Sequence, residues 1–347
     1  MTGGRLAENP IIKVSDVKPS RPDFKVVGAF NAGVAAYGDE TILLVRVAEM
    51  PAEVPEKFVA VPLLNEGDGQ LEIQHLSVTD SRYTFDDSRV VKQQGRYAYL
   101  TSMSHLRVAR SKDGVHFVVD EKPSLFPTDS LEAWGIEDPR ITGIGDKYYI
   151  TYSAVSSKGV AVRLATTDDF VMYEKQSILL PPENKDAAIF PELIHGKYYM
   201  LHRPVPKAIG SPEMWIAESP DMIHWGNHRF LMGLREGSWD GGRMGGGAVP
   251  LLTEEGWLEL YHGADSDDRY CMGAVLLDKQ DPGKVLARSR VPLLSPDADY
   301  EAFGFFGGVV FSCGALLAGR TVRMYYGAAD EVMARADFTL EEIYRTF

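Results

Sequence analysis

The 347-residue chain has little cysteine and no surplus of basic residues. Cys271 and Cys313 are its two cysteines, and two thiols in a chain of this length are more typical of a reducing compartment than of a disulfide framework. Lys and Arg number 36 against 49 Asp and Glu, so the formal net charge is −13. Because a duplex nucleic-acid binder needs a basic face, we expect no nucleic-acid partner, and any anionic ligand would require a local basic pocket.

Long apolar runs and the common cofactor motifs are also missing. No window approaches 18 apolar residues, and the N-terminus lacks the apolar run of a signal peptide, which predicts a cytoplasmic protein with no membrane partner. The eight histidines show no zinc spacing, no phosphate loop of the Gly-x-x-x-x-Gly-Lys type is present, and GGRMGGG (241–247) does not match the dinucleotide pattern. We therefore expect neither a metal nor a cofactor.

What the sequence has is a two-part repeat rich in glycine and aromatic residues. The first part is a hairpin, in which a Gly- or Pro-marked strand and a polar turn precede a strand rich in aromatic and β-branched residues. The second part is a short strand that ends in a Ser/Thr/Asp turn and an aromatic residue. The hairpin copies are residues 30–47, 87–104, 138–155, 190–204, 246–264 and 307–329, and the second-part copies are 108–117, 164–173, 216–225, 273–285 and 334–343.

The spacing of the second part predicts an all-β fold, a β-propeller. Its copies start about 52 to 61 residues apart, the length of four strands with their turns, which is one propeller blade. A β-sandwich with similar turns is the alternative. Six hairpins against five second parts leave the blade number open, and an inserted hairpin or a blade shared by both termini would explain the difference. We expect one domain over 1–347, with an N-terminal arm (1–20) and a C-terminal closing segment (about 335–347).

The inner strands of a propeller surround a central channel, so polar residues on those strands converge at one mouth. Burying many charges is costly unless they pair or bind a ligand. For any single residue, the alternative is an ion pair that joins neighbouring blades. The polar residues that the six hairpins contribute are Asn31, Arg46, Asp87, Arg89, Glu137, Asp138, Arg140, Glu192, His202, Arg203, His262 and Asp330.

The run Glu137-Asp138-Pro139-Arg140 is the sharpest short motif. Pro139 predicts an extended conformation for Asp138, because the ring disfavours a helical residue before it. Alternation along a strand predicts that Glu137 and Asp138 face opposite sides, so only one of them would face the channel. A carboxylic acid there could protonate a glycosidic oxygen as the leaving group departs.

A set of cationic residues points to an anion pocket. Arg203 and His262 end equivalent strands of successive hairpins, in His-Arg-Pro and Tyr-His-Gly, and Lys185 lies in Asn-Lys-Asp. The forked guanidinium of arginine suits bidentate binding of an oxyanion. The alternative for each residue is a salt-bridged position on the rim.

Seven runs of the chain resemble glycoside hydrolase family 130, the β-mannoside phosphorylases. They follow in family order over about residues 8–343: FNAG…LLVRVAE, GIEDPRIT, NKDAAIFPE, MLHRP, GGGAVPLLTEEGWLELYHGAD, LLDKQDPGKVLARS and YYGAAD. The resemblance implies a five-bladed β-propeller and inverting phosphorolysis, in which inorganic phosphate, a co-substrate, attacks the anomeric carbon and releases α-D-mannose 1-phosphate. One acid suffices, because phosphate is already an anionic nucleophile.

The resemblance also implies roles for individual residues. Asp138 matches the catalytic acid, which in this family is thought to act through a hydroxyl of the bound mannose. The family's hydrolases lack the phosphate-binding set, so the presence of Arg203 and His262 favours a phosphorylase. The matching phosphate ligands are Lys185, Arg203, His262 and Tyr270, and the matching mannose ligands are Asn31, Arg46, Arg140 and Asp330.

The length of one interval bears on the linkage that is cleaved. Asn31 and Asp138 lie 107 residues apart, longer than we expect for family members that cleave β-1,4-mannosides. The extra residues 96–111 and the segment 17–20 resemble the branch that acts on β-1,2-linked mannobiose and manno-oligosaccharides. One alternative is an inverting β-mannosidase that uses water, with Asp138 as acid and a glutamate such as Glu192 as base. The other is a non-catalytic sugar-binding propeller. Because family members are commonly oligomers, we expect a homodimer.

Overall fold

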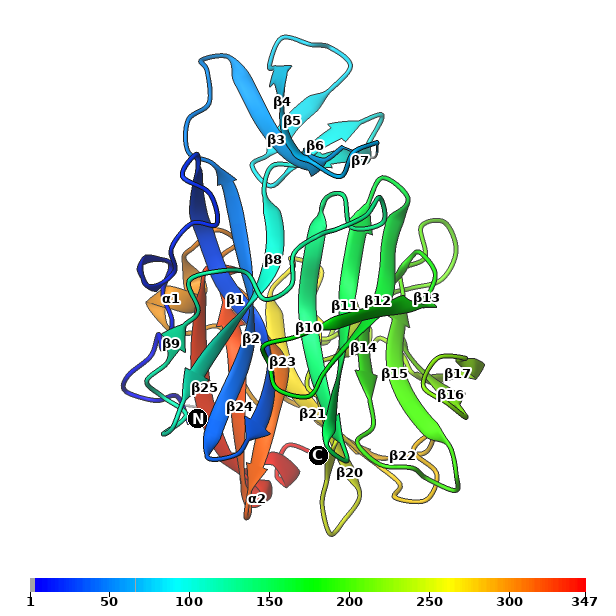
Figure 1. The fold of residues 1–347 in the computed structure, drawn as a ribbon. Helices are drawn as coiled ribbons and strands as arrows, with labels where there is room; N and C mark the ends of the chain where they lie inside the picture. The colour runs from blue at the N-terminus through cyan, green and yellow to red at the C-terminus, as the bar shows by residue number, and fades with distance from the viewer. Residues whose placement is uncertain (1–3, 66) are drawn as a thin grey trace.

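The computed structural model describes residues 4–65 and 67–347, and nearly all of its regular structure is β-sheet. The strands form five groups of consecutive strands plus one insertion (Figure 1). Within each group neighbouring strands are antiparallel, as expected for strands joined by short polar turns. In the described ranges no helix has the length and apolar character needed to cross a membrane.

The first two groups form one sheet. A single parallel bridge between Ser104 and Gly135 joins them. The first group consists of β1 (Phe24–Tyr37), β2 (Glu40–Pro51), β8 (Met103–Ser111) and β9 (Val118–Val119), and the second consists of β10 (Gly135–Ile144), β11 (Lys147–Ser156), β12 (Gly159–Thr167) and β13 (Glu174–Leu180).

The other three groups are separate sheets. The third is β14 (Asn184–Ile189), β15 (Tyr198–Pro204), β16 (Met214–Ser219) and β17 (Gly226–Met232). The fourth is β18 (Arg243–Gly246), β19 (Leu251–Leu252), β20 (Trp257–Ala264), β21 (Tyr270–Leu277) and β22 (Val285–Arg288). The fifth is β23 (Val310–Ala318), β24 (Thr321–Ala328) and β25 (Val332–Thr339).

The ends of the chain meet at the fifth sheet. Arg5 and Ile12 form bridges to Ala336 and Met333 of β25, so the N-terminal segment lies along the edge of the last sheet. The short helical elements are η1 (Val14–Asp16), α1 (Asp299–Ala302) and α2 (Leu340–Tyr344), which follows β25 directly.

The second part of the sequence repeat is a repeated turn in the structure. A Ser or Thr hydroxyl at the end of a strand accepts a hydrogen bond from the backbone N–H three residues on. The Asp that lies two residues after this Ser or Thr accepts from the backbone N–H groups two and three residues beyond itself. This pattern occurs at Ser111 and Asp113, at Thr167 and Asp169, and at Ser219 and Asp221. The repeat in the sequence therefore reflects a repeated local structure.

The hairpin copy that exceeds the five second parts of the repeat belongs to an insertion between β2 and β8. The copy at 87–104 contains the second and third strands of a small sheet, and this sheet and a second one lie together beyond one end of the long strands (Figure 1). Leu64 of the insertion packs in one apolar cluster with Met103 at the start of β8 and with Ala133, just before β10. The insertion strands are β3 (Phe58–Leu64), β4 (Leu71–Ser77), β5 (Thr84–Asp87), β6 (Val90–Gln93) and β7 (Arg96–Leu100).

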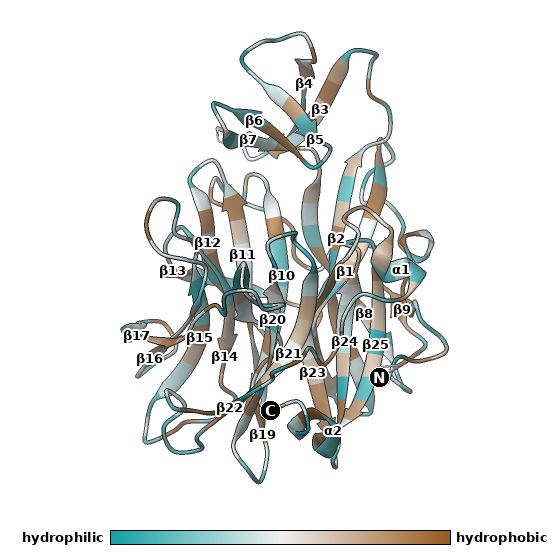
Figure 2. Cartoon of the chain, turned by 180° about the vertical axis from the view of Figure 1, so that it is seen from behind, coloured by the Kyte–Doolittle hydropathy of each residue, from teal (hydrophilic) through white to brown (hydrophobic). Residues whose placement is uncertain are grey.

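The hydrophobic core is divided among five large clusters that lie between neighbouring groups. One cluster each joins the first group to the second, the second to the third, the third to the fourth and the fourth to the fifth. A further cluster joins the fifth group back to the first and includes Ile12 of the N-terminal segment. Figure 2 shows the apolar residues along these strands and mainly polar residues in the connecting loops.

Candidate active site

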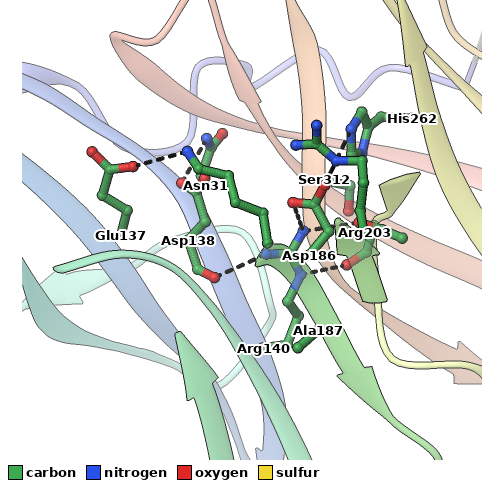
Figure 3. A network of polar contacts seen from close by, with 12 residues as sticks. Asn31, Glu137, Asp138, Arg140, Asp186, Ala187, Arg203, His262 and Ser312 are labelled. Carbon is green, nitrogen blue, oxygen red and sulfur yellow. Dashed lines mark hydrogen bonds and ion pairs between the residues drawn. The ribbon is translucent and has the colours of Figure 1, made fainter. Parts of the chain in front are cut away.

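The first strands of three neighbouring groups are interrupted at a corresponding point. Asn31 in β1, Asp138 in β10 and Asp186 in β14 have positive φ angles of 49°, 50° and 56°. The pairing register of each strand shifts at that residue, as in a β-bulge. Asn and Asp tolerate the left-handed region better than most residues do, which suits them to this position. In Figure 3 the three side chains lie in one polar network.

The bulge at Asp138 overturns two expectations from the sequence. Asp138 has a φ of 50°, so the extended conformation predicted before Pro139 is wrong. Glu137 and Asp138 also do not face opposite sides, because the bulge breaks the alternation of the strand. Both carboxylates accept hydrogen bonds from Arg46, from Nη2 to Glu137 Oε1 at 2.8 Å and from Nη1 to Asp138 Oδ1 at 3.0 Å.

Asp138 lies in a cationic environment. Its Oδ1 also accepts a hydrogen bond from Asn31 Nδ2 at 3.0 Å. Burial alone would raise the pKa of Asp138, but the positive charges of Arg46 and Lys185, among others, hold that pKa below its ordinary value. The carboxylate is therefore ionised in the free protein. To act as an acid, it must gain a proton when a ligand weakens the influence of these cations.

Asp330, in the turn between β24 and β25, has a raised pKa, whereas the pKa of Asp138 is lowered. Burial raises the pKa of Asp330 to about 6, and the negative charges of Asp138 and Glu137 add to that effect. Arg46 and Arg89 oppose it. Two aspartates of one cluster thus have pKa values on opposite sides of the ordinary value, a pattern typical of functional sites.

The raised pKa of Asp330 predicts a pH-dependent stability. Ionisation of this carboxyl costs more in the folded than in the unfolded state, so the free energy of unfolding should fall as pH rises from 3.8, the ordinary pKa, through about 6. The fall should reach about 3 kcal/mol, since each pKa unit corresponds to about 1.4 kcal/mol. Urea unfolding of the wild type and of Asp330→Asn between pH 4 and 8 measures it. The difference between the two proteins should change over this range, and parallel curves would contradict the assignment.

Asp186 connects two arginines and a histidine. Its Oδ2 accepts a hydrogen bond from Arg203 Nε at 2.5 Å, and its Oδ1 accepts one from Arg140 Nη2 at 3.2 Å. His262 Nε2 lies 3.6 Å from Asp186 Oδ2. Gly245 must lack a side chain here, because a Cβ would lie 2.3 Å from Asp186 Oδ2 and 2.7 Å from His262 Cε1.

Arg140 is buried beneath this cluster, and the protein itself occupies most of its donors. Besides Asp186, the guanidinium donates to the backbone carbonyls of Asp138, Gly246 and Gly247 at 2.9 to 3.0 Å. These bonds join the second, third and fourth groups of strands. The arrangement favours a structural role for Arg140, and its contact with a sugar stays a prediction.

His262 is fully buried, and its ring is held by aromatic neighbours and not by hydrogen bonds from the described part of the chain. Among the described residues, neither of its ring nitrogens has a hydrogen-bond partner. The ring packs between Tyr270 and Phe311, with ring centroids 6.0 and 4.5 Å away. Burial lowers the pKa of His262 to about 3 against the attraction of Asp186, so the imidazole is neutral at pH 7. A buried polar group without a partner in the protein is commonly satisfied by a water or a ligand.

The other predicted phosphate ligands are Lys185, which lies opposite Arg203 on the neighbouring strand, and Tyr270, whose ring stacks on His262. Lys185 Nζ lies 3.5 Å from Glu137 Oε2, which links the pocket to the Arg46 cluster. The Tyr270 hydroxyl accepts a hydrogen bond from Arg243 Nη1 at 2.8 Å. No group of three or more His, Cys, Asp or Glu within the described ranges could hold a metal ion.

Some of the polar residues expected to converge do not join this network. Asp87 and Arg89 of the insertion pair with each other, and the Arg89 guanidinium lies over the Phe306 ring at 3.9 Å. Arg89 is near enough to act on the pKa of Asp330, but among the described residues it has no hydrogen bond to the network. Glu192 is exposed and follows the end of β14 that is farther from Lys185. His202 hydrogen-bonds with Asn184 and His228 instead.

One residue of the network was missed in the sequence. Asp186 directly follows Lys185, and strand alternation assigns it to the opposite face. Asp186 lies outside the hairpin copy at 190–204, so the repeat did not point to it. The available signal was the small residue that follows it, since Ala187 follows Asp186 as Ala32 follows Asn31.

The fold and the site, taken together with the similarity of the chain to known proteins, define a carbohydrate-active enzyme. Residues 69–347 match the model of glycoside hydrolase family 130, described as β-1,4-mannooligosaccharide phosphorylase. The β-1,2-mannobiose phosphorylase of Listeria innocua is 52% identical over 98% of this chain and 96% of its own length. The 1,2-β-oligomannan phosphorylase of a Thermoanaerobacter species is 38% identical over 70% of this chain and 80% of its own.

A solved structure supports the same relationship. The complex of the Listeria innocua phosphorylase with β-1,2-mannobiose superposes with a TM-score of 0.97 at 51% identity, covering 100% of this chain and 99% of that one. The chain belongs to glycoside hydrolase family 130, and the resemblance seen in its sequence is confirmed.

Proposed function

We propose that this protein catalyses the inverting phosphorolysis of β-1,2-linked mannobiose or manno-oligosaccharides, yielding α-D-mannose 1-phosphate and a shortened acceptor. The observation that carries the proposal is the buried pair of Arg203 and His262, in which Arg203 supplies the positive charge and His262 has no hydrogen-bond partner among the described residues. The two relatives reported above, both named for 1,2-linked substrates, support the linkage.

Phosphate binding follows from the donors that the pocket leaves free. Arg203 uses Nε for Asp186, and its two Nη groups have no hydrogen bond to the described residues. Both Nη groups can therefore bind two oxygens of one phosphate. Neutral His262 adds one N–H donor, Lys185 adds a positive charge at the side nearer Asp138, and Tyr270 is proposed to complete the pocket.

The acid in this reaction is proposed to be Asp138. Bound phosphate places negative charge beside Lys185 and Arg203, and Lys185 is one of the cations that lower the pKa of Asp138. Phosphate binding should therefore raise that pKa and favour the protonated acid. The proton then moves toward the glycosidic oxygen, through a mannose hydroxyl as the family resemblance implies, while phosphate attacks the anomeric carbon from the opposite face.

The mannose site is proposed to lie at the Arg46 cluster. Asn31, Arg46 and Asp330 offer a donor amide, a guanidinium and a carboxyl within one region, with Arg140 beneath them. A water-using β-mannosidase with Glu192 as base is less well supported, since Glu192 is exposed beyond the far end of β14. A non-catalytic sugar-binding protein would not need the unpartnered His262.

We also propose that the five groups of strands are the blades of one five-bladed propeller. Its support is the cycle of five core clusters, of which the last joins the fifth group to the first. The reaction is proposed to need no metal or cofactor, with inorganic phosphate as co-substrate. A cytoplasmic location and a homodimer complete the proposal, and two free buried cysteines support the reducing compartment.

A comparison of linkages tests the proposed substrate. Purified protein is incubated with excess phosphate and either β-1,2- or β-1,4-mannobiose, and α-D-mannose 1-phosphate is quantified. We expect the β-1,2 substrate to react at least about tenfold faster in kcat/KM, the discrimination that a few displaced sugar contacts provide. A preference for β-1,4-mannobiose would contradict the linkage but leave phosphorolysis intact.

A further inference from the structure

Asp186 connects two arginines of the polar network. It lies at the bulge of β14 with a side chain 3% exposed, between the predicted phosphate pocket and the arginine below the mannose site (Figure 3). One carboxylate oxygen is bound by Arg203 and the other by Arg140. The two arginines are therefore held at a fixed separation by one side chain.

The surroundings of Asp186 leave it little freedom. The left-handed φ of 56° is one that few side chains tolerate, and the missing side chain of Gly245 lets the carboxylate approach the neighbouring strand. Burial would raise the pKa of Asp186, but the positive charges of Arg203 and Arg140 hold it well below its ordinary value. Asp186 is thus a fixed negative charge among cations.

We infer that Asp186 is the positioning residue of the phosphate pocket, which it orders by holding Arg203 at Nε so that both Nη groups are presented to the anion. Asp186 itself would not touch phosphate, because two negative groups repel. Through Arg140 it also fixes the pocket relative to Asp138, whose backbone carbonyl accepts from the same guanidinium. This inference rests on the proposed phosphorolysis. A merely structural ion pair would instead affect stability alone.

The variant Asp186→Asn separates these roles. An amide has one acceptor and one donor end, so the asparagine of this variant could accept from Arg203 or from Arg140 but not from both. We expect the KM for phosphate to rise about tenfold or more, because an unheld arginine loses its preorganised fork. The KM for mannobiose should change less than about threefold. An unchanged KM for phosphate in an active, folded variant would overturn the inference.

A matched control is available in the second group of strands. Glu132 is fully buried and pairs with Arg163 at 3.0 Å and Lys175 at 2.5 Å, so Glu132→Gln removes a comparable charge outside the site. This variant should lose stability while its KM for phosphate stays within about twofold of the wild type. A similar rise in both variants would mean that Asp186 has only a structural role, which overturns the inference.

A double-mutant cycle tests whether Asp186 acts through Arg203. If it does, Asp186→Asn combined with Arg203→Ala should have a KM for phosphate within about twofold of Arg203→Ala alone. Effects that multiply would overturn the inference. If Asp186→Asn does not fold, Arg203→Lys provides the second test. Lysine keeps the charge but cannot bond Asp186 and fork to phosphate at once, so its KM should match Arg203→Ala within about threefold, and a wild-type KM would overturn the inference.

An assay of the wild type distinguishes a failure of this inference from a failure of the proposed function. A wild type that forms no mannose 1-phosphate with phosphate refutes the proposed function and the inference together. A phosphate-dependent wild type whose Asp186→Asn variant keeps the same KM for phosphate refutes the inference alone.

Discussion

Replacing Asp138 with Asn should abolish nearly all phosphorolysis, with kcat lower by about 10³-fold or more, the contribution of a positioned general acid. Asn preserves the shape of the side chain and can still accept from Asn31 or Arg46, but it has no proton to give. The measurement is the initial rate of mannose 1-phosphate formation from β-1,2-mannobiose at saturating phosphate. Thermal unfolding of the variant shows whether the fold is retained.

A control with the same chemistry is Asp337→Asn, which removes a carboxylate from an arginine pair outside the site. Asp337 accepts from Arg335 through both oxygens at 2.5 and 2.7 Å, on the outer strand β25. Its kcat should stay within about twofold of the wild type. If Asp138→Asn retained more than about a tenth of the wild-type kcat, another group would have to supply the proton, and the acid assignment would be wrong.

Replacing Arg203 with Ala should raise the KM for phosphate about 10- to 100-fold, the equivalent of losing one charge-assisted contact of about 1.5–3 kcal/mol. The KM for mannobiose should change far less, because Arg203 lies on the Asp186 and His262 side of the network. Initial rates with phosphate varied at saturating mannobiose, and with mannobiose varied at saturating phosphate, separate the two constants.

Arg235→Ala is the matched control for this prediction. Arg235 also pairs with a buried aspartate, Asp240, at 2.7 Å, but it lies outside the network of Arg203 and His262. Its two KM values should stay near those of the wild type. Equal increases in both KM values for Arg203→Ala would mean that the residue supports the site as a whole, and the pocket would need a different assignment.

The fold class could be read from the sequence because the repeat is local. A Ser or Thr followed by Asp ends a strand in the same way at 111–113, 167–169 and 219–221, and such turns depend only on residues close in the chain. The place of residues 87–104 could not be read in this way. Their hairpin pattern is the same as in the other copies, and only long-range pairing shows that they belong to an insertion.

The sequence predicted which residues lie together in the candidate site, but not how they are arranged. Lys185, Arg203 and His262 were identified from the sequence, and the structure brings them around Asp186 and Glu137, with His262 neutral and the other two charged. Alternation of side chains failed at Asp138 and Asp186, because a bulge depends on how a strand fits its neighbours and leaves no periodic signal. The roles of the individual ligands stay predictions that the variants above test.

The acidic composition and the anion pocket are compatible. The net charge of −13 belongs to the whole chain, whereas the predicted phosphate site is a local cluster in which Arg203, Arg140 and Lys185 lie against the two carboxylates of Asp186 and Glu137. Charges inside a low-dielectric interior act over short distances more strongly than exposed charges do. A small anion can therefore bind to a protein whose overall charge repels large polyanions.

The most direct test of the central claim is ³¹P NMR of the wild-type protein with β-1,2-mannobiose and inorganic phosphate. Phosphorolysis predicts that the phosphate signal is converted to that of α-D-mannose 1-phosphate, one molecule for each mannobiose cleaved, and that omission of phosphate stops cleavage. Release of free mannose at the same rate without phosphate, with no new phosphorus signal, would contradict the account.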